Sequence, residues 1–164
     1  MIYVGVDNGC TGSIGIIDTK TNSSIYLNTP VFESLSYLKS RVSFLNRVNV
    51  NVLESIFVPL GKDVKVMLER PMVNPARFNQ SLSAMRALEA TLIVLERLNL
   101  RYEYIDSKEW QKALLPQHDA KADLKKLSKE IGMRFFPQIE WKNFKDADGL
   151  LIAEYCRIKD NERK

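Results

Sequence analysis

The sequence has little of the chemistry that nucleophilic enzymes and thiolate metal sites use. Its 164 residues include two cysteines, Cys10 and Cys156, and one histidine, His118. The cysteines lie far apart and neither belongs to a CxxC or Cys/His pattern, which argues against a disulfide framework and a zinc site. With one histidine, in an expected loop, a Ser-His-Asp or Cys-His catalytic set is not expected either.

Long hydrophobic runs are also absent. No apolar stretch approaches the ~18 residues that span a bilayer, and residues 1–7 lack the basic start and apolar core of a signal peptide. We therefore expect a cytoplasmic protein, in a bacterium or in the host cell if a phage encodes it, with no membrane partner.

The composition that is present is that of an ordinary globular protein, with 45% hydrophobic and 27% charged residues. A chain of this length can enclose one hydrophobic core. We expect a single domain over residues 1–158 and a charged tail over 159–164 that frays. The net charge of +4 favours a polyanionic partner, although many unrelated proteins share such an excess.

The order of strand and helix patterns predicts an α/β fold with a five-stranded mixed sheet flanked by helices. Strands are expected at 2–6, 13–17 and 24–27, forming an antiparallel meander, and at 64–68 and 102–105, which run parallel. Helices are expected at 32–60, with a break in 46–51, and at 79–98, 107–115, 121–131 and 146–158. Gly132 is expected to end the helix 121–131.

Acidic residues fall where such a sheet would bring them together. Asp7 ends the first strand, Glu69 ends the fourth, and Asp148, with Asp146 before it, lies in the first turn of the last helix. Carboxylates gathered at neighbouring strand ends raise each other's pKa unless a cation lies between them. Mg²⁺ prefers oxygen ligands, and two such ions ~3.5–4 Å apart can hydrolyse a phosphodiester without a protein nucleophile.

Each of these residues also has a plain structural interpretation. Asp7 could begin a hairpin turn, and Glu69 could form a surface ion pair at its strand end. Asp146 and Asp148 could do no more than complement the dipole of the last helix. Taken together, the residues favour metal ligands, and the two interpretations of Asp146 stay open.

Three motifs follow one another along the chain. They are VGVDNGCTGSIG at 4–15, MLERP at 67–71 and DADGLLIA at 146–153. In this order they resemble the motifs of the RuvC family of Holliday junction resolvases, within the RNase H-like superfamily. The resemblance covers nearly the full chain. It implies a homodimeric endonuclease that cuts branched DNA, above all four-way junctions, by paired symmetric nicks, with two Mg²⁺ or Mn²⁺ ions per active site.

The resemblance also assigns metal ligands. By position, Asp7, Glu69 and Asp148 match acidic ligands of the family. The fourth ligand usually lies three residues before the last aspartate, where this sequence has Lys145. Asp146 is offset by one position, so that it either reaches the metal from the helix start or acts from outside the ligand set.

Basic residues near the motifs are expected to contact DNA. The segment 121–137 resembles the basic helix and Phe-Pro ending of phage-type members, which implies that Lys121 faces the scissile phosphate. The segment 107–112 resembles a stretch that supplies another active-site lysine, here Lys108 or Lys112. A cation there would offset charge that develops in the transition state, although a lysine-rich helix face is usually only solvated. The remaining expected DNA contacts are Arg70, Arg77 and Lys125.

Two other functions remain open. The stretch 7–12 also resembles the phosphate-binding hairpin of actin-like ATPases and sugar kinases. Those proteins need two lobes and 164 residues supply one, so no nucleotide cofactor is expected. The second alternative is an RNase H-like module that binds nucleic acid without catalysis, and Lys145 at a usually acidic position supports it.

Overall fold

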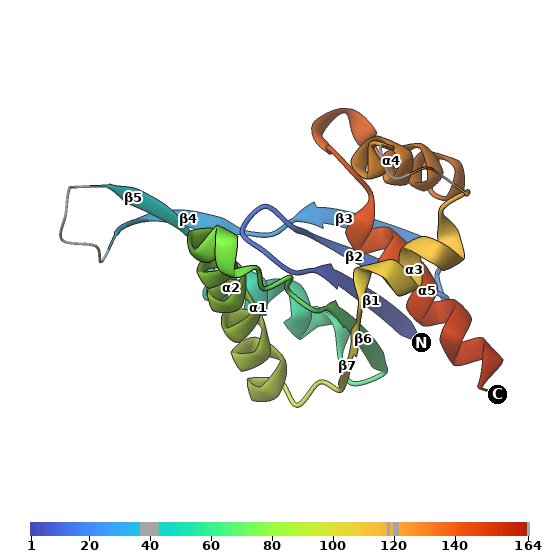
Figure 1. Ribbon diagram of the computed structural model, residues 1–164. Coiled ribbons are helices and arrows are strands. Elements are labelled where there is room, and N and C mark those ends of the chain that lie inside the picture. The colour runs from blue at the N-terminus through green and yellow to red at the C-terminus, as the bar shows by residue number, and fades with distance from the viewer. Residues whose placement is uncertain (37–42, 118, 120–121, 164) are drawn as a thin grey trace.

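The computed structural model describes residues 1–36, 43–117, 119 and 122–163. Its centre is a five-stranded sheet in the order β3-β2-β1-β6-β7 (Figure 1). The strands are β1 (Ile2–Asp7), β2 (Ser13–Asp18), β3 (Ser23–Asn28), β6 (Val64–Glu69) and β7 (Tyr102–Ile105). β1, β2 and β3 pair antiparallel, whereas β6 and β7 run parallel to β1. The predicted α/β class and mixed sheet are confirmed, and each predicted strand agrees within one residue at either end.

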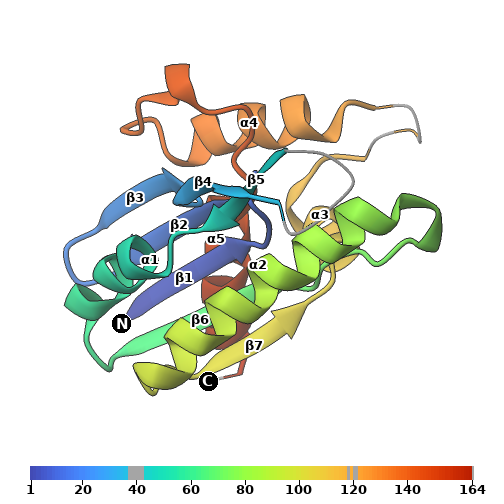
Figure 2. The ribbon, with the colours of Figure 1, turned by 90° about the vertical axis from the view of Figure 1, so that its left-hand side faces the viewer.

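Helices cover both faces of this sheet (Figures 1 and 2). The helices are α1 (Val50–Phe57) and α2 (Phe78–Arg97) on one face, and α3 (Ser107–Leu114), α4 (Leu124–Phe135) and α5 (Asp148–Glu162) on the other. Short 3₁₀ turns occupy Val58–Leu60, Pro75–Arg77 and Trp141–Asn143. Because side chains alternate along a strand, Tyr3 packs into the core under α5, and Val4 and Val6 pack into the core under α1 and α2. Within the described residues, no helix is both long and apolar enough to cross a bilayer.

The prediction of a helix over 32–60 is wrong for its first half. An antiparallel hairpin of β4 (Val31–Leu35) and β5 (Phe44–Val48) precedes α1. Its Leu and Phe side chains are spaced as in a helix, but Leu35 and Phe44 are 65% and 64% exposed, so no buried helical face lies behind that spacing. The helix begins only after Asn49, whose side chain accepts the backbone N–H of Val52. Residues 37–42 lie outside the described part of the chain.

The helix predicted at 121–131 begins and ends later. Asp123 caps α4, because its carboxylate accepts the backbone N–H groups of Lys125 and Lys126. The predicted stop at Gly132 is wrong, since α4 continues to Phe135. A Cβ atom on residue 132 would lie 2.3 Å from the Cβ of Ala147. The glycine therefore serves close packing rather than helix termination.

The last helix starts two residues later than predicted. It also extends into the segment that was expected to fray. α5 continues to Glu162, so that the segment from Lys159 is helical. Asp160 is only 6% exposed, accepts a hydrogen bond of 2.7 Å from the Tyr3 hydroxyl, and is ion-paired with Lys65. These contacts join the last turns of α5 to β1 and β6.

The backbone of α5 packs directly against the backbones of β1 and β2. Gly5 and Gly15 are cross-strand partners beneath the helix. A Cβ atom on Gly5 would lie 2.2 Å from the nitrogen of Ala153, and one on Gly15 would lie 2.4 Å from the Cα of Leu150. Only glycine permits so close an approach. This close packing holds the first turn of α5, and with it Asp148, beside the ends of the strands.

Candidate metal centre

The acidic residues singled out in the sequence come together where β1 and β6 end. Ligand oxygens of Asp7, Asp146 and Asp148 all lie within 4.8 Å of one another. Glu69 ends β6, which pairs with β1 in parallel, and its charge acts directly on the pKa of Asp7. Two strand ends, a loop and a helix start thus supply four neighbouring carboxyl groups.

Electrostatics of this cluster favour uptake of a proton or a cation. Burial and then the negative charges of Glu69 and Asp148 raise the pKa of Asp7 well above its ordinary value. Burial raises the pKa of Glu69 to about 7, against the opposing effect of a hydrogen bond from Trp110. Burial and the charge of Asp146 raise the pKa of Asp148 to about 6. Crowded carboxylates of this kind are stabilised when a cation lies among them.

Neutral donors from two helices orient Glu69 and Asp148. The indole N–H of Trp110 in α3 donates to Glu69 Oε2 at 2.8 Å, and the hydroxyl of Ser128 in α4 donates to Asp148 Oδ1 at 2.5 Å. Each carboxylate keeps one oxygen without a protein partner among the described residues. Asp7 accepts no side-chain hydrogen bond from that part of the chain. Outer hydrogen bonds of this type orient metal-ligating carboxylates.

Asp146 differs, because both of its oxygens are engaged. It is 1% exposed, and its Oδ1 accepts the hydroxyl of Tyr26 at 2.9 Å. Its Oδ2 lies 3.3 Å from Nζ of Lys125 and 3.9 Å from Nζ of Lys145. Lys145 also donates to the carbonyl of Thr11, and burial together with Lys125 lowers the pKa of Lys145. Asp146 is therefore enclosed by protein donors.

The lysines expected to contact DNA have different positions. Lys125 is half-exposed and contacts Asp146, so it belongs to the site itself. Lys108 and Lys112 are exposed on α3 and point away from its buried side. Lys121 lies outside the described residues, so its predicted place at the scissile phosphate stays a prediction.

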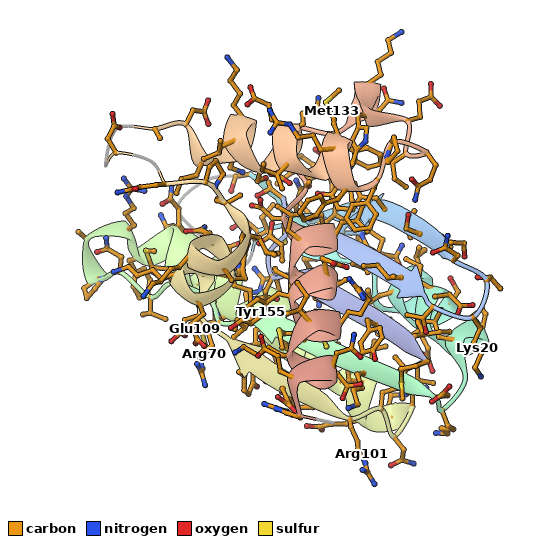
Figure 3. All side chains as sticks on the ribbon, turned by 90° about the vertical axis from the view of Figure 1, so that its right-hand side faces the viewer. Lys20, Arg70, Arg101, Glu109, Met133 and Tyr155 are labelled. Atoms are coloured by element: carbon orange, nitrogen blue, oxygen red, sulfur yellow. The ribbon has the colours of Figure 1, made fainter. Side chains whose placement is uncertain are left out.

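The two arginines lie farther along the same edge. Arg70 follows Glu69, forms an ion pair of 2.9 Å with Asp106 and lies over the ring of Tyr104. Figure 3 shows Arg70 pointing outward below α3. Arg77 is exposed at the end of Pro75–Arg77, in the segment that leads into α2. Both are accessible to a ligand at this edge.

Sequence reasoning missed the groups that hold the carboxylates. Trp110 is a core residue, 1% exposed, and its N–H also donates to Glu69. Ser128 was not singled out, although it lies three residues after Lys125 and so shares its helix face. That spacing was the available signal. Nothing in the sequence pattern pointed to Tyr26.

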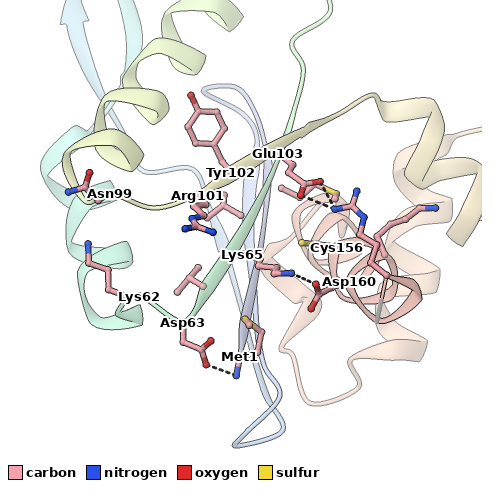
Figure 4. A pocket seen from close by; sticks show the side chains of 15 residues that line it. Met1, Lys62, Asp63, Lys65, Asn99, Arg101, Tyr102, Glu103, Cys156 and Asp160 are labelled. Atoms are coloured by element: carbon pink, nitrogen blue, oxygen red, sulfur yellow. Dashed lines mark hydrogen bonds and ion pairs between the residues drawn. The ribbon is translucent and has the colours of Figure 1, made fainter.

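A separate cavity of about 520 Å³ lies at the other end of the sheet (Figure 4). It is formed at the amino ends of β1 and β6, whereas the carboxylates gather at their carboxyl ends. Ion pairs cross it, including Lys65 with Asp160 and the amino group of Met1 with Asp63. It takes no part in the acidic cluster.

Three antiparallel strands followed by two parallel ones, with α5 packed across the first strands, form the RNase H-like fold. Within that class the structure matches RuvC of Thermus thermophilus. It superposes on RuvC in complex with a Holliday junction substrate with a TM-score of 0.62 and 12% identity, covering 96% of both chains. A second structure of T. thermophilus RuvC gives a TM-score of 0.56 and 13% identity, covering 97% of both chains. The resemblance predicted from the motifs is thus confirmed for the fold.

Sequence comparisons add no relatives. No protein-family model matches the chain, and no curated protein does.

Proposed function

We propose that this protein is a metal-dependent endonuclease that cuts branched DNA, above all four-way junctions, by paired symmetric nicks. The observation that carries the proposal is the gathering of Asp7, Glu69, Asp146 and Asp148 at one edge of an RNase H-like sheet. The likeness to a RuvC chain that was solved with a Holliday junction substrate supports branched DNA as the partner.

The donor set fits a hard divalent cation, Mg²⁺ or Mn²⁺. All its ligand atoms are carboxylate oxygens; those of Asp7, Asp146 and Asp148 lie within 4.8 Å of one another, and Glu69 lies near enough for its charge to raise the pKa of Asp7. When bound, such an ion activates water and stabilises the leaving oxygen of a phosphodiester. Two ions, the number predicted from the sequence, would need Asp146 as a ligand.

The chain's own residues would position the substrate. Asp7, Glu69 and Asp148 would hold the ion. Trp110 in α3 orients Glu69, and Ser128 in α4 orients Asp148. Lys125 lies beside them with its side chain half-exposed, where it can bind a phosphate oxygen. The exposed Lys108 and Lys112 can bind the DNA backbone that continues across α3.

Two arginines after β6 would extend this contact. Arg70 and Arg77 are exposed after β6 and can bind phosphates there. Lys121 is proposed to contact DNA on the same grounds as before, by its resemblance to the phage-type motif.

We further propose a homodimer, because two symmetric nicks across one junction need two active sites. Apolar side chains project from α2 and from the segment before it. Met72, Val73, Phe78 and Met85 are 78%, 63%, 68% and 43% exposed. A neighbouring group of exposed apolar residues of this kind is typical of a protein interface. Size measurement of the wild type and of Phe78→Asp tests it, with a dimer expected only for the wild type.

Incubation of the purified protein with a labelled four-way junction and with matched linear duplex tests the function. We expect cutting of the junction in Mg²⁺, none in EDTA, and no requirement for ATP. Junction binding without cutting in any metal would instead favour the non-catalytic module. ATP hydrolysis without DNA cutting would favour the ATPase alternative.

A further inference from the structure

The four carboxylates of the metal centre are not equivalent as ligands. Among the described residues, Asp7 has both oxygens open, and Glu69 and Asp148 have one each. Both oxygens of Asp146 already have protein partners, Oδ1 the hydroxyl of Tyr26 and Oδ2 the lysine ammonium groups, although a ligand oxygen of Asp146 lies within 4.8 Å of those of Asp7 and Asp148. The open oxygens thus belong to three residues that lie on β1, β6 and the first turn of α5.

From this difference we infer that the ammonium groups of Lys125 and Lys145 stand in for a second divalent ion, so that the centre holds one ion, on Asp7, Glu69 and Asp148. The inference rests on the proposed metal-dependent function and specifies how that site is built. Asp146 then becomes a positioning residue, which holds the two lysines next to the reacting phosphate.

Charge balance favours one ion. The four carboxylates carry four negative charges when ionised, and two ammonium groups together with one divalent ion carry four positive charges. A second divalent ion would leave an excess of two positive charges if Lys125 and Lys145 stayed at Asp146, and would otherwise have to displace both of them. In a site this buried, a second divalent ion and the two nearby ammonium groups would repel one another strongly.

The fold holds both ammonium groups in place. Lys145 precedes Asp146 in the loop before α5 and donates to the carbonyl of Thr11, in the hairpin that follows Asp7. Lys125 lies on the face of α4 that also carries Ser128, which in turn bonds to Asp148. The same helix thus supplies one cation and orients one metal ligand. Lys145, at the position that is usually acidic in the RuvC family, thus has defined partners in Asp146 and the carbonyl of Thr11.

Mn²⁺ titration of the metal-free, full-length protein tests this inference without any cutting assay. Calorimetry and the electron paramagnetic resonance signal of free Mn²⁺ each give the number of ions bound per chain. We expect about one Mn²⁺ per chain for the wild type and for Asp146→Asn. The double variant K125M/K145M leaves Asp146 uncompensated, and we expect it to take up a further ion or to bind Mn²⁺ on the order of tenfold more tightly.

Lys126→Met is the matched control, because Lys126 neighbours Lys125 on α4 but its side chain is exposed and lies outside the centre. It should bind Mn²⁺ as the wild type does. The single variant Lys125→Met gives the same test if the double variant does not fold, and we expect it also to bind Mn²⁺ more tightly.

Two Mn²⁺ per wild-type chain, with one lost in Asp146→Asn, would overturn the inference and leave the metal-dependent nuclease intact. Unchanged Mn²⁺ binding in both lysine variants would also overturn it. Failure to bind Mn²⁺ together with failure to cut junctions in Mg²⁺ would overturn the proposed function as well, so that the two failures can be told apart.

Discussion

Trp110 donates its indole N–H to Glu69 Oε2 across 2.8 Å, from a side chain that is 1% exposed. The bond joins α3 to the end of β6. It also stabilises the ionised form of Glu69, because it lowers a pKa that burial raises to about 7. A residue buried in the core thus also orients a proposed metal ligand.

Trp110→Phe should keep most of the packing and remove this donor. We expect roughly 10- to 100-fold weaker metal binding or junction cutting, the usual effect of losing an outer partner of a metal ligand. The pKa of Glu69 should rise further, so that cutting reaches its plateau at higher pH. Cutting rates measured against Mg²⁺ concentration and pH report both effects.

Trp141→Phe is the control for this change. The Trp141 indole donates to the carbonyl of Phe136, within the core and away from Glu69. We expect this variant to lose stability but to keep the metal and pH dependence of the wild type. Equal effects of the two tryptophan variants would show that Trp110 acts through packing alone.

Replacing a proposed metal ligand should separate cutting from binding. Asp7→Asn and Glu69→Gln should each reduce junction cutting on the order of 10³-fold, because catalysis depends on charge placed at the reacting phosphate. Gel-shift affinity for the junction in Ca²⁺ or EDTA should remain largely intact. Asp63→Asn makes the same change at the opposite end of β6, where the carboxylate is exposed, and should cut normally. Retained cutting by Asp7→Asn or Glu69→Gln would remove that residue from the site.

Asp7 and Glu69 could be predicted from the sequence because each directly follows a buried strand, and parallel strands bring their carboxyl ends to one edge. Asp148 could be placed through the helix pattern after it. The role of Asp146 could not, since it depends on Tyr26 and Lys125, which lie 120 and 21 residues away along the chain. Such contacts arise from packing of α4 and β3 and leave no periodic signal.

The β4–β5 hairpin was mispredicted for a related reason. Periodicity identifies an element only when one side of it is buried. Phe32 is 43% exposed and Leu35 is 65% exposed, so that the apolar residues of the hairpin do not mark a core-facing side. In α2, where Ala87, Val94 and Leu95 are buried, the same spacing predicted the helix within one residue.

The raised pKa values predict how stability depends on pH in the absence of metal. The pKa of Glu69 rises from 4.5 to about 7 and that of Asp148 from 3.8 to about 6, largely through burial. Since the folded state binds these protons more tightly than the unfolded state, stability is lost as the pH rises through about 4 to 7, on the order of a few kcal/mol.

In EDTA the melting temperature should therefore fall between pH 5 and pH 8, and Mg²⁺ should restore much of the loss at pH 8 by binding the ionised carboxylates. Asp7→Asn should melt higher than the wild type at pH 8 in EDTA, because one repelling charge is gone. Differential scanning calorimetry in both conditions measures this. A melting temperature that rises with pH in EDTA would contradict the cluster's electrostatics.

The glycine contact between α5 and the sheet should control the metal centre from a distance. Gly15→Ala would place a Cβ atom 2.4 Å from the backbone of Leu150, and neither backbone can turn aside as a side chain could. We expect destabilisation of about 3 kcal/mol or more. The added Cβ atom should push α5 away from the sheet. Because α5 carries Asp148 at its start, Mn²⁺ affinity should fall even at temperatures where the variant remains folded. Denaturant unfolding and Mn²⁺ titration measure the two effects, and weakened stability with unchanged Mn²⁺ affinity would show that the position of Asp148 does not depend on this contact.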